Sequence, residues 1–258
     1  MNARKGRDFV ETADYLPGQW RHSTAKRLAR SLLFWLVRML VRLLFRVHDQ
    51  EVERLPAQGP MVVAVNHINW FDIPVIYVAS LPRPMTGLVK VESWDNPLLR
   101  TLFDLIDAIP LRRGEVDRTA LKQALAALKA HYLLGIAPEG TRSHDGKLIQ
   151  GHHGVAMLGL LSKAPILPAA HYGGEAVRRN LGRLRRTDIH LAVGRPFYLD
   201  PGEAKVTKEL RQQMVDEIMY QIAALLPASY RGYYSDLSAA TTTFLRFLPE
   251  EEGTAGGS

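Results

Sequence analysis

Residues 61–72 of the chain read MVVAVNHINWFD, an apolar run followed at once by a histidine and an aspartate. The first five residues predict a buried strand. His67 and Asp72 stand about 140° apart on an ideal helix, so they cannot meet on one helical face. They can meet if the chain turns after the strand and Asp72 begins a helix, and Pro74 favours the first turn of a helix. The stretch therefore predicts a strand, a turn and a helix that bring the two side chains together.

Other apolar runs also predict strands, and periodic segments between them predict helices. The expected strands span 61–65, 86–90, 133–137, 166–171 and 188–193. The expected helices span 73–80, 96–105, 116–131, 153–163 and 205–226. Because strands and helices alternate, we expect an α/β fold, a mixed sheet layered with helices.

The composition indicates a folded chain of ordinary globular character. It has 258 residues, of which 47% are apolar, and this is enough for a sizeable core. It contains no cysteine, so disulfides, thiolate metal sites and cysteine nucleophiles are excluded. We expect 1–50 to form an N-terminal anchoring segment, 51–235 the main domain and 236–258 a partly disordered tail, with disorder expected at 250–258.

The segment 25–47 contains no Gly or Pro and is predicted to form one helix. Its five arginines fall within an arc of roughly 160°, opposite a face rich in Leu and Trp. This pattern is typical of an amphipathic helix that lies in a membrane interface. Arg38 and Arg42 argue against a transmembrane span, because each would cost roughly 2.5–3.5 kcal/mol near its middle. The alternative is a surface helix that packs its leucines on the domain core.

Positive charge is concentrated in two places. Residues 1–50 carry ten Lys or Arg against four Asp or Glu, in a chain whose net charge is +7. Such clusters attract nucleic acid, anionic lipid or an acidic carrier protein, and charge alone does not choose among them. No DNA- or RNA-binding motif is present, so no nucleic-acid partner is expected. The second cluster comprises Arg178, Arg179, Arg183, Arg185 and Arg186.

A second polar stretch follows the predicted strand 133–137, where active-site loops of α/β sheets gather. Residues 137–143 read APEGTRS. Gly140 allows the backbone to approach a ligand closely, and Arg142 offers a bidentate fork for phosphate. The alternative is a tight turn with a surface salt bridge between Glu139 and Arg142.

His67 and Asp72 suit general-base chemistry. A histidine can take a proton near neutral pH, and a carboxylate bonded to its other ring nitrogen fixes the tautomer. No serine is needed when the substrate itself supplies the hydroxyl. Two plainer interpretations stay open: Asp72 caps the helix, and His67 is a partly buried structural histidine.

In this order, the two polar stretches resemble the first and third sequence blocks of the glycerolipid acyltransferase family, which includes the lysophosphatidic acid acyltransferases. Residues 108–114, AIPLRRG, look like the second block, and residues 165–168, PILP, look like the fourth. The four blocks span 66–168. The resemblance implies a glycerol-3-phosphate acyltransferase-like α/β fold, preceded by the amphipathic membrane helix.

The resemblance also implies roles for individual residues. His67 would be the general base and Asp72 the residue that orients it. No metal is expected, and no cofactor beyond acyl-CoA or acyl carrier protein (acyl-ACP) as co-substrate. The implied substrate-binding residues are Arg113, with Arg112 as the alternative, Glu139, Gly140, Thr141 and Arg142 for the acceptor phosphate, Lys90 near the same site, and Pro168 for the acyl donor.

The implied reaction moves a fatty acyl chain from acyl-ACP or acyl-CoA to the sn-2 hydroxyl of 1-acyl-glycerol 3-phosphate (lysophosphatidic acid). It forms phosphatidic acid, a step of phospholipid biosynthesis. The expected location is the cytoplasmic face of a bacterial inner membrane, with membrane lipid as the interfacial partner. The alternatives are the same chemistry on glycerol 3-phosphate or another lyso-lipid, hydrolysis by the same His/Asp pair, and a non-catalytic basic membrane-binding module.

Overall fold

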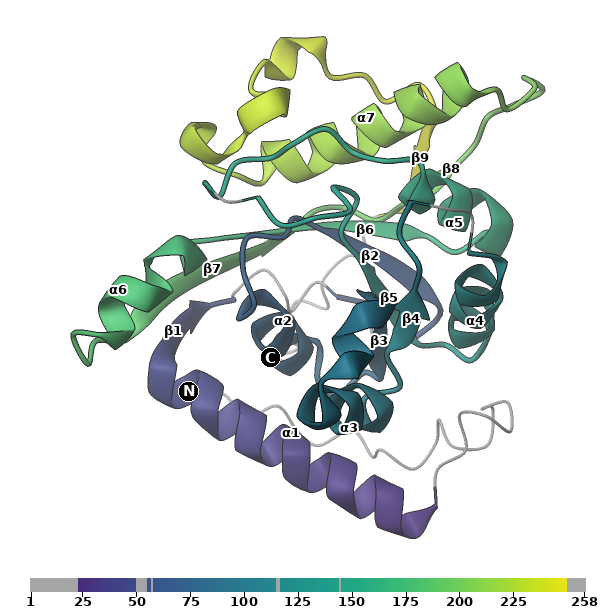
Figure 1. The fold of residues 1–258 in the computed structure, drawn as a ribbon. Helices are drawn as coiled ribbons and strands as arrows, with labels where there is room; N and C mark the ends of the chain where they lie inside the picture. The colour runs from purple at the N-terminus through teal and green to yellow at the C-terminus, as the bar shows by residue number, and fades with distance from the viewer. Residues whose placement is uncertain (1–22, 50–54, 57, 115–116, 144, 250–258) are drawn as a thin grey trace, which may run out of the picture.

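The computed structural model describes residues 23–49, 55–56, 58–114, 117–143 and 145–249, and within them nine strands form one sheet flanked by helices (Figure 1). The helices are α1 (Thr24–Leu44), α2 (Asp72–Ser80), α3 (Pro97–Leu105), α4 (Arg118–Lys129), α5 (Gly154–Ser162), α6 (Val177–Leu181) and α7 (Lys208–Ala224). The strands are β1 (Phe45–His48), β2 (Met61–Val65), β3 (Met85–Lys90), β4 (Ile109–Leu111), β5 (Leu133–Ile136), β6 (Ile166–Tyr172), β7 (Thr187–Val193), β8 (Phe197–Leu199) and β9 (Leu245–Phe247). Short 3₁₀ turns are η4 (Val91–Asp95), η5 (Gly174–Ala176), η6 (Ala228–Tyr230), η7 (Gly232–Tyr234) and η8 (Leu237–Ala239).

The predicted architecture, a mixed sheet layered with helices, is confirmed. The five expected strands correspond to β2, β3, β5, β6 and β7, and β2 has the predicted bounds. The elements β8, β9 and α6 were not predicted, because with three, three and five residues they show too little periodicity.

The strand order β1-β7-β6-β2-β5-β3-β4 gathers the carboxyl ends of the central strands at one edge. β6, β2, β5, β3 and β4 are mutually parallel, whereas β7 runs antiparallel to β6 and β1 runs parallel to β7. Tyr172, the last residue of β6, pairs with His190 in the middle of β7. The start of β7, and β1 beside it, therefore lie at or beyond this carboxyl edge.

Helices cover both faces of the sheet (Figure 1). α4, α5 and α7 pack on one face, and α1, α2 and α3 pack on the other. All five residues of β2 are buried, because Val62 and Ala64 face the first layer while Met61, Val63 and Val65 face the second. This double burial explains the continuous apolar run, and it fixes the end of β2, where the polar turn begins.

The N-terminal helix is shorter than the predicted 25–47. α1 ends at Leu44, and 45–48 form β1, which pairs with β7. The first element of the sheet thus lies inside the segment that was expected to be a separate anchor, so the boundary predicted at residue 50 is wrong for β1. Backbone pairing at the sheet edge overrides the helical pattern of these four residues.

The surface of α1 has a packed side and an exposed apolar side. Phe34 and Val41 pack against the α2 and α3 layer, and Phe34 stacks on Tyr77 of α2 with ring centroids 5.6 Å apart. The core-packing alternative therefore holds for this side only. No helix in the described part of the chain is both long and apolar enough to cross a membrane. The exposed apolar side comprises Leu28, Leu32, Trp35, Leu36, Met39, Leu40 and Leu43.

Residues 236–249, which were expected to belong to a tail, pack on the domain. β9 pairs with β8, and Leu245 is buried. The buried carboxylate of Glu217 on α7 accepts hydrogen bonds from the backbone N–H groups of Thr243 and Phe244 at 2.7 and 2.9 Å. The disorder expected at 250–258 falls on residues outside the described ranges.

Candidate active site

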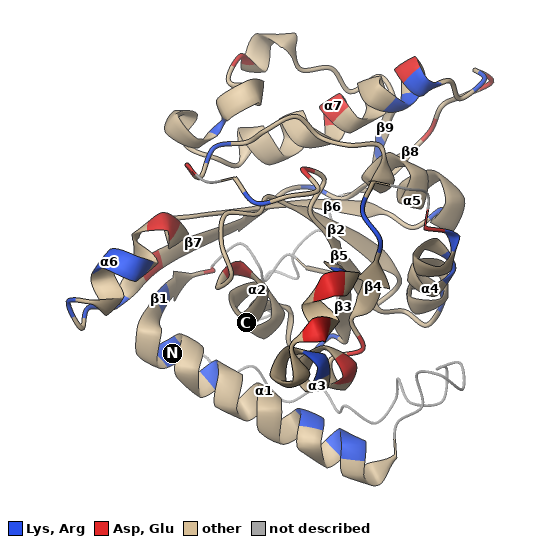
Figure 2. Ribbon diagram, viewed as in Figure 1, with Lys and Arg blue, Asp and Glu red and all other residues tan. Residues whose placement is uncertain are grey.

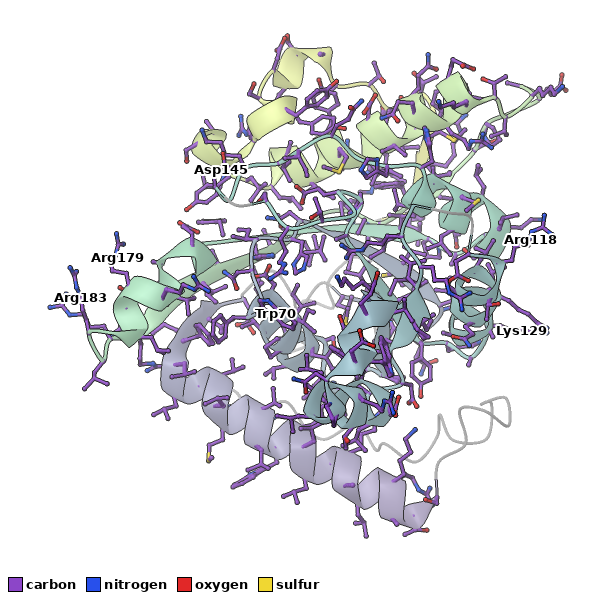
Figure 3. The ribbon with its side chains drawn as sticks, in the orientation of Figure 1. Trp70, Arg118, Lys129, Asp145, Arg179 and Arg183 are labelled. Atoms are coloured by element: carbon purple, nitrogen blue, oxygen red, sulfur yellow. The ribbon has the colours of Figure 1, made fainter. Side chains whose placement is uncertain are left out.

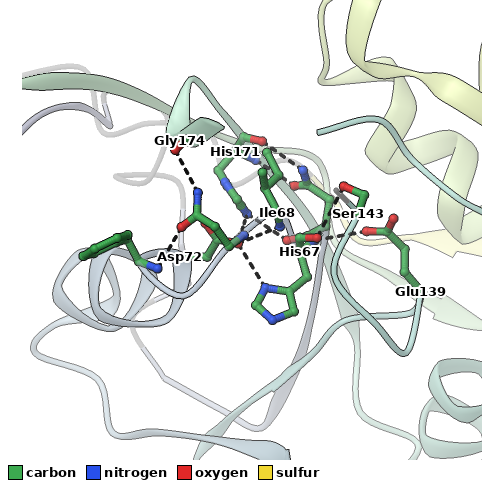
Figure 4. A network of polar contacts seen from close by, with 10 residues as sticks. His67, Ile68, Asp72, Glu139, Ser143, His171 and Gly174 are labelled. Carbon is green, nitrogen blue, oxygen red and sulfur yellow. Dashed lines mark hydrogen bonds and ion pairs between the residues drawn. The ribbon is translucent and has the colours of Figure 1, made fainter. Parts of the chain in front are cut away.

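The structure brings His67 and Asp72 together at the carboxyl end of β2 (Figure 4). The chain leaves β2, turns, and enters α2 at Asp72, as the sequence predicted. His67 Nδ1 lies 3.0 Å from Asp72 Oδ2, and the His67 side chain is 19% exposed while Asp72 is buried. Since an ionised carboxylate only accepts hydrogen bonds, Nδ1 carries the proton in the neutral ring and Nε2 is left as the basic nitrogen.

The carboxylate of Asp72 is fixed by the turn before it. Its Oδ2 atom accepts hydrogen bonds from the backbone N–H groups of Ile68 and Asn69, both at 2.7 Å. These donors precede the helix, and the residue at the N-cap position, Phe71, makes no side-chain capping bond. The interpretation of Asp72 as a helix cap is therefore wrong: its side chain faces back toward the histidine.

A second histidine, which the sequence did not identify, lies behind Asp72. His171, near the end of β6, is buried, and its Nε2 lies 2.8 Å from the backbone oxygen of Asn66 and 3.4 Å from Asp72 Oδ2. Asn66 exchanges two further hydrogen bonds of 2.9 Å with the His171 backbone. The sequence does contain a signal for this residue, because His171 is a polar residue near the end of the apolar strand β6. β6 pairs with β2, so the end of β6 lies beside the His67 turn.

Glu139 lies in the same network and is buried away from solvent. Its side chain is 0% exposed, and its two oxygens accept hydrogen bonds of 3.0 Å from the backbone N–H groups of His67 and Ile149. Burial raises the pKa of Glu139 from 4.5 to about 6, and the two N–H donors oppose that rise. Glu139 thus links the loop after β5 to the histidine, rather than lining the acceptor site as expected.

The other predicted site residues of the loop after β5, which are Gly140, Thr141 and Arg142, face solvent. Gly140 has φ +65°, a conformation that favours glycine, and a Cβ there would lie 3.0 Å from the ring of His152. Thr141 is exposed, and the guanidinium of Arg142 lies over the ring of Trp70, 5.0 Å from its centroid. The surface salt bridge between Glu139 and Arg142 that was the alternative is therefore wrong.

The other predicted basic residues lie farther along the same edge. Arg112 and Arg113 follow β4 and are exposed, and Lys90 ends β3, with its Nζ 4.0 Å from Glu92. β4 is three strands from β2, a separation of about 14 Å at ordinary strand spacing. These residues thus share the edge with His67 without contacting it.

Pro168 lies apart from this cluster. It is buried within β6, where it pairs with Ala64 of β2. Its backbone oxygen accepts a hydrogen bond of 2.8 Å from the N–H of Gly194. Among the described residues, no group of three or more His, Asp or Glu side chains is arranged to hold a metal ion.

The family model described as "Acyltransferase" matches residues 46–172. The chain is 28% identical to a 1-acyl-sn-glycerol-3-phosphate acyltransferase of Bacillus subtilis, over 67% of this chain and 84% of that protein. It is also 28% identical to a lyso-ornithine lipid O-acyltransferase of Pseudomonas aeruginosa, over 80% of this chain and 82% of that protein.

A solved structure supports the fold. The crystal structure of the 1-acyl-sn-glycerophosphate acyltransferase PlsC from Thermotoga maritima superposes with a TM-score of 0.57 at 21% identity, covering 85% of each chain. The matched region of the family model, 46–172, contains the His67–Asp72 turn, the loop after β5 and all of β6. The family model and the two relatives support the glycerolipid acyltransferase family, and the chain is an acyltransferase.

Proposed function

We propose that this acyltransferase moves a fatty acyl chain from acyl-CoA or acyl-ACP to the sn-2 hydroxyl of 1-acyl-glycerol 3-phosphate. The observation that carries the proposal is the 3.0 Å contact between His67 and a buried Asp72. It leaves Nε2 of a partly exposed imidazole free to receive a proton from an alcohol. The names of the relatives supply the class of acceptor.

The proposed mechanism needs one base and no enzyme-bound acyl group. His67 Nε2 takes the proton of the acceptor hydroxyl as its oxygen attacks the thioester carbonyl of the donor. The tetrahedral intermediate collapses, the carbon–sulfur bond breaks, and the departing thiolate takes the proton back from His67. Asp72 holds the imidazole in the correct tautomer and stabilises its protonated form in between.

The acceptor phosphate is proposed to bind beside this pair. Arg142 follows β5, the strand next to β2, and it is exposed. Its guanidinium offers the bidentate fork that phosphate oxygens favour. Arg112 and Arg113 supply further positive charge at the same edge, so an acceptor lying along it would have its hydroxyl at His67 and its phosphate toward the arginines.

The exposed apolar side of α1 is proposed to lie in the membrane interface. Leu32 and Trp35 are 59% and 60% exposed, and Arg38 and Arg42 are exposed along one border of this side. Leucine, tryptophan and flanking arginines are the composition of an interfacial helix. The proposed location is the cytoplasmic face of the membrane that supplies the acceptor.

A second candidate is transfer to a lyso-ornithine lipid. The match to the Pseudomonas aeruginosa relative covers 80% of this chain, against 67% for the Bacillus subtilis relative. The row of exposed basic residues favours the phosphate-bearing acceptor instead, since a phosphate monoester carries more negative charge.

The test is acyl transfer by detergent-extracted protein, with each donor offered lysophosphatidic acid, lyso-ornithine lipid and glycerol 3-phosphate. Wild type is compared with His67→Ala and with the control His131→Asn, an exposed histidine at φ +61° before β5. Asparagine tolerates that backbone conformation, so the control should remain folded and active. We expect His67→Ala to lose 10²- to 10⁴-fold in rate.

Other outcomes identify the alternatives. Equal activity of folded His67→Ala and wild type would make His67 structural and refute the mechanism. Free fatty acid formed without any acceptor would indicate a hydrolase. Product from the ornithine lipid alone would select the second candidate and remove the phosphate role of Arg142.

A further inference from the structure

Residues 177–186, the arginine loop, form the most strongly charged segment outside the candidate active site. They contain five arginines and no acidic residue. Within the described residues, no carboxylate lies within ion-pair distance of Arg178, Arg179, Arg183 or Arg185. The basic colour of α6 stands out in Figure 2, and Figure 3 shows Arg179 and Arg183 pointing away from the body of the molecule. The charge of this segment is therefore available to a partner.

Hydrogen bonds order the arginine loop, and one of its leucines is exposed to solvent. The backbone oxygen of Asn180 accepts hydrogen bonds from the N–H groups of Arg183 and Arg185 at 3.0 and 2.9 Å, and its side chain donates to Thr187 Oγ1 at 3.1 Å. Between these bonds Leu184 has φ +51° and is 98% exposed. Both features are unfavourable for a leucine in water, so this residue points to an apolar partner.

The loop lies next to the end of α1. Arg186 donates a hydrogen bond to the backbone oxygen of Phe45, and Phe45 pairs with Thr187 in the β1–β7 ladder. This junction also reaches the candidate site, because the ring of Phe45 contacts that of Phe71 with centroids 5.7 Å apart. The arginine loop, the end of α1 and the His67 turn therefore border one side of the molecule.

A basic hollow is lined by residues of the arginine loop, β1 and β7. It has a volume of about 590 Å³, and its lining residues are Arg46, Asn180, Leu184, Arg185, Arg186 and Asp188. Asp188 partly neutralises it, with Oδ2 3.5 Å from Arg46 and Oδ1 3.1 Å from His48 Nε2. Three arginines against one aspartate leave a site suited to a phosphate-bearing headgroup.

We propose that the arginine loop is a second membrane-contact element that binds anionic phospholipid. Its arginines bind headgroup phosphates, and Leu184 enters the interface beside the apolar side of α1. The inference rests on the proposed function in one respect, since it takes the bilayer to be the source of the acceptor. An acidic carrier protein would match the charge but would leave the exposed leucine unexplained.

Membrane contact at both α1 and the arginine loop would restrain the orientation of the enzyme more than contact at α1 alone. A single interfacial helix contacts the bilayer along one line and leaves the domain some freedom to rock about the helix axis. A second contact at the arginine loop removes that freedom and holds the carboxyl edge, with His67, toward the bilayer. Anionic lipid then affects both the affinity and the orientation of the enzyme.

The test is binding of the full-length protein to vesicles of phosphatidylcholine, with and without phosphatidylglycerol. The loop variant is Arg179→Gln/Arg183→Gln/Arg185→Gln. The matched control changes the exposed cations of α4, on the opposite side of the molecule (Figure 3), and also removes three charges: Arg118→Gln/Lys122→Gln/Lys129→Gln.

We expect the loop variant to lose on the order of 100-fold in affinity for anionic vesicles at low salt, about fivefold for each arginine, and little for neutral vesicles. The α4 control should change only a few-fold. Leu184→Asn should lower affinity for both vesicles on the order of tenfold. It should not lower thermal stability, because asparagine tolerates positive φ better than leucine.

Equal losses in the two triple variants would mean that only net charge matters, and the proposal would be overturned. Unchanged vesicle binding together with a raised KM for acyl-ACP, but not for acyl-CoA, would assign the loop to the carrier protein and also overturn it. Wild-type acyl transfer to detergent-dispersed acceptor tests the proposed function separately, since that assay contains no bilayer.

Discussion

At the scale of single residues, Asp72 determines what His67 can do. One carboxylate oxygen faces His67 Nδ1, two backbone N–H groups and the ring of His171. All of these neighbours approach the same atom, so a group that does not accept hydrogen bonds cannot replace it. The arrangement fixes the tautomer of His67 without any contribution from a substrate.

We therefore expect Asp72→Asn to lower kcat by about 10³- to 10⁴-fold with little change in KM, because the amide oxygen can accept these hydrogen bonds but lacks the negative charge that stabilises protonated His67. Steady-state kinetics with each donor measures the effect, and the melting temperature checks the fold. The control is Asp104→Asn, which changes an exposed aspartate bonded to Trp94 at 2.9 Å and should leave kcat unchanged. A folded Asp72→Asn enzyme with wild-type kcat would refute the proposed role.

Glu139 should make the folding stability of the protein depend on pH. Because burial raises its pKa from 4.5 to about 6, the folded state binds this proton more tightly than the unfolded chain. The resulting stability is fully present below pH 4.5 and is lost as the pH rises through about 6, a loss of about 2 kcal/mol.

Glu139→Gln should remove this pH dependence while costing roughly 1–3 kcal/mol near neutral pH, since its NH₂ group would face a backbone donor. Urea unfolding at several pH values measures both effects. The exposed Glu203→Gln should follow wild type. Identical pH profiles for Glu139→Gln and wild type would show that this carboxyl does not titrate in the predicted range.

At the scale of elements, a buried ion pair fixes α1 to the sheet. Arg30 and Asp107 pair with side chains 10% and 8% exposed, and Lys26 Nζ lies 2.8 Å from the same carboxylate. Asp107 itself has φ +55° just before β4. The attachment of α1 to the domain therefore depends on a residue about 80 positions away in the chain.

Asp107→Asn should destabilise the protein by roughly 3–5 kcal/mol, because the buried Arg30 loses the negative charge of Asp107 while asparagine still tolerates the positive φ. The expected fall in melting temperature is roughly 6–20 °C. Asp200→Asn breaks the exposed pair with Arg246, and its expected cost is below about 1 kcal/mol. Equal costs in the two variants would contradict the structural role given to Asp107.

The local sequence pattern was sufficient to predict most helices and strands. It was insufficient where segments that are far apart in the sequence contact each other. The apolar run of β2 and the His67–Asp72 turn are local, and both were predicted. β1 continues a helical pattern with no glycine to end it, and only its pairing with β7 makes it a strand. The contact of His171 with Asp72 likewise depends on β6 lying beside β2, which periodicity does not reveal.

At the scale of the whole molecule, the structure explains an imperfection in the amphipathic pattern of α1. Phe34 and Val41 fall among the arginines because they face the protein, while the Leu/Trp side faces away from it. One helix thus has two apolar sides, of which one packs on the domain and the other is exposed. The predicted interfacial helix and the core-packing alternative describe its two sides, and membrane contact stays a prediction.

Leu32→Ser/Trp35→Ser should lower affinity for vesicles on the order of 100-fold, whatever the lipid charge, and leave the melting temperature nearly unchanged. The matched control is Leu161→Ser/Tyr233→Ser, whose side chains are 55% and 62% exposed, with Leu161 on α5 and Tyr233 beside α7. Comparable losses in both variants would indicate non-specific adsorption rather than binding through α1.

The pairing of β1 with β7 also sets an order of events during synthesis. Arg186 and its partner Phe45 are separated by 141 positions, so β1 leaves the ribosome long before the strand that receives it. α1 precedes every strand of the described sheet, and its exposed apolar side does not depend on any of them. The proposed contact of α1 with the bilayer can therefore form before the His67–Asp72 turn has folded. Closure of the sheet edge, a contact of high sequence separation, comes late in folding.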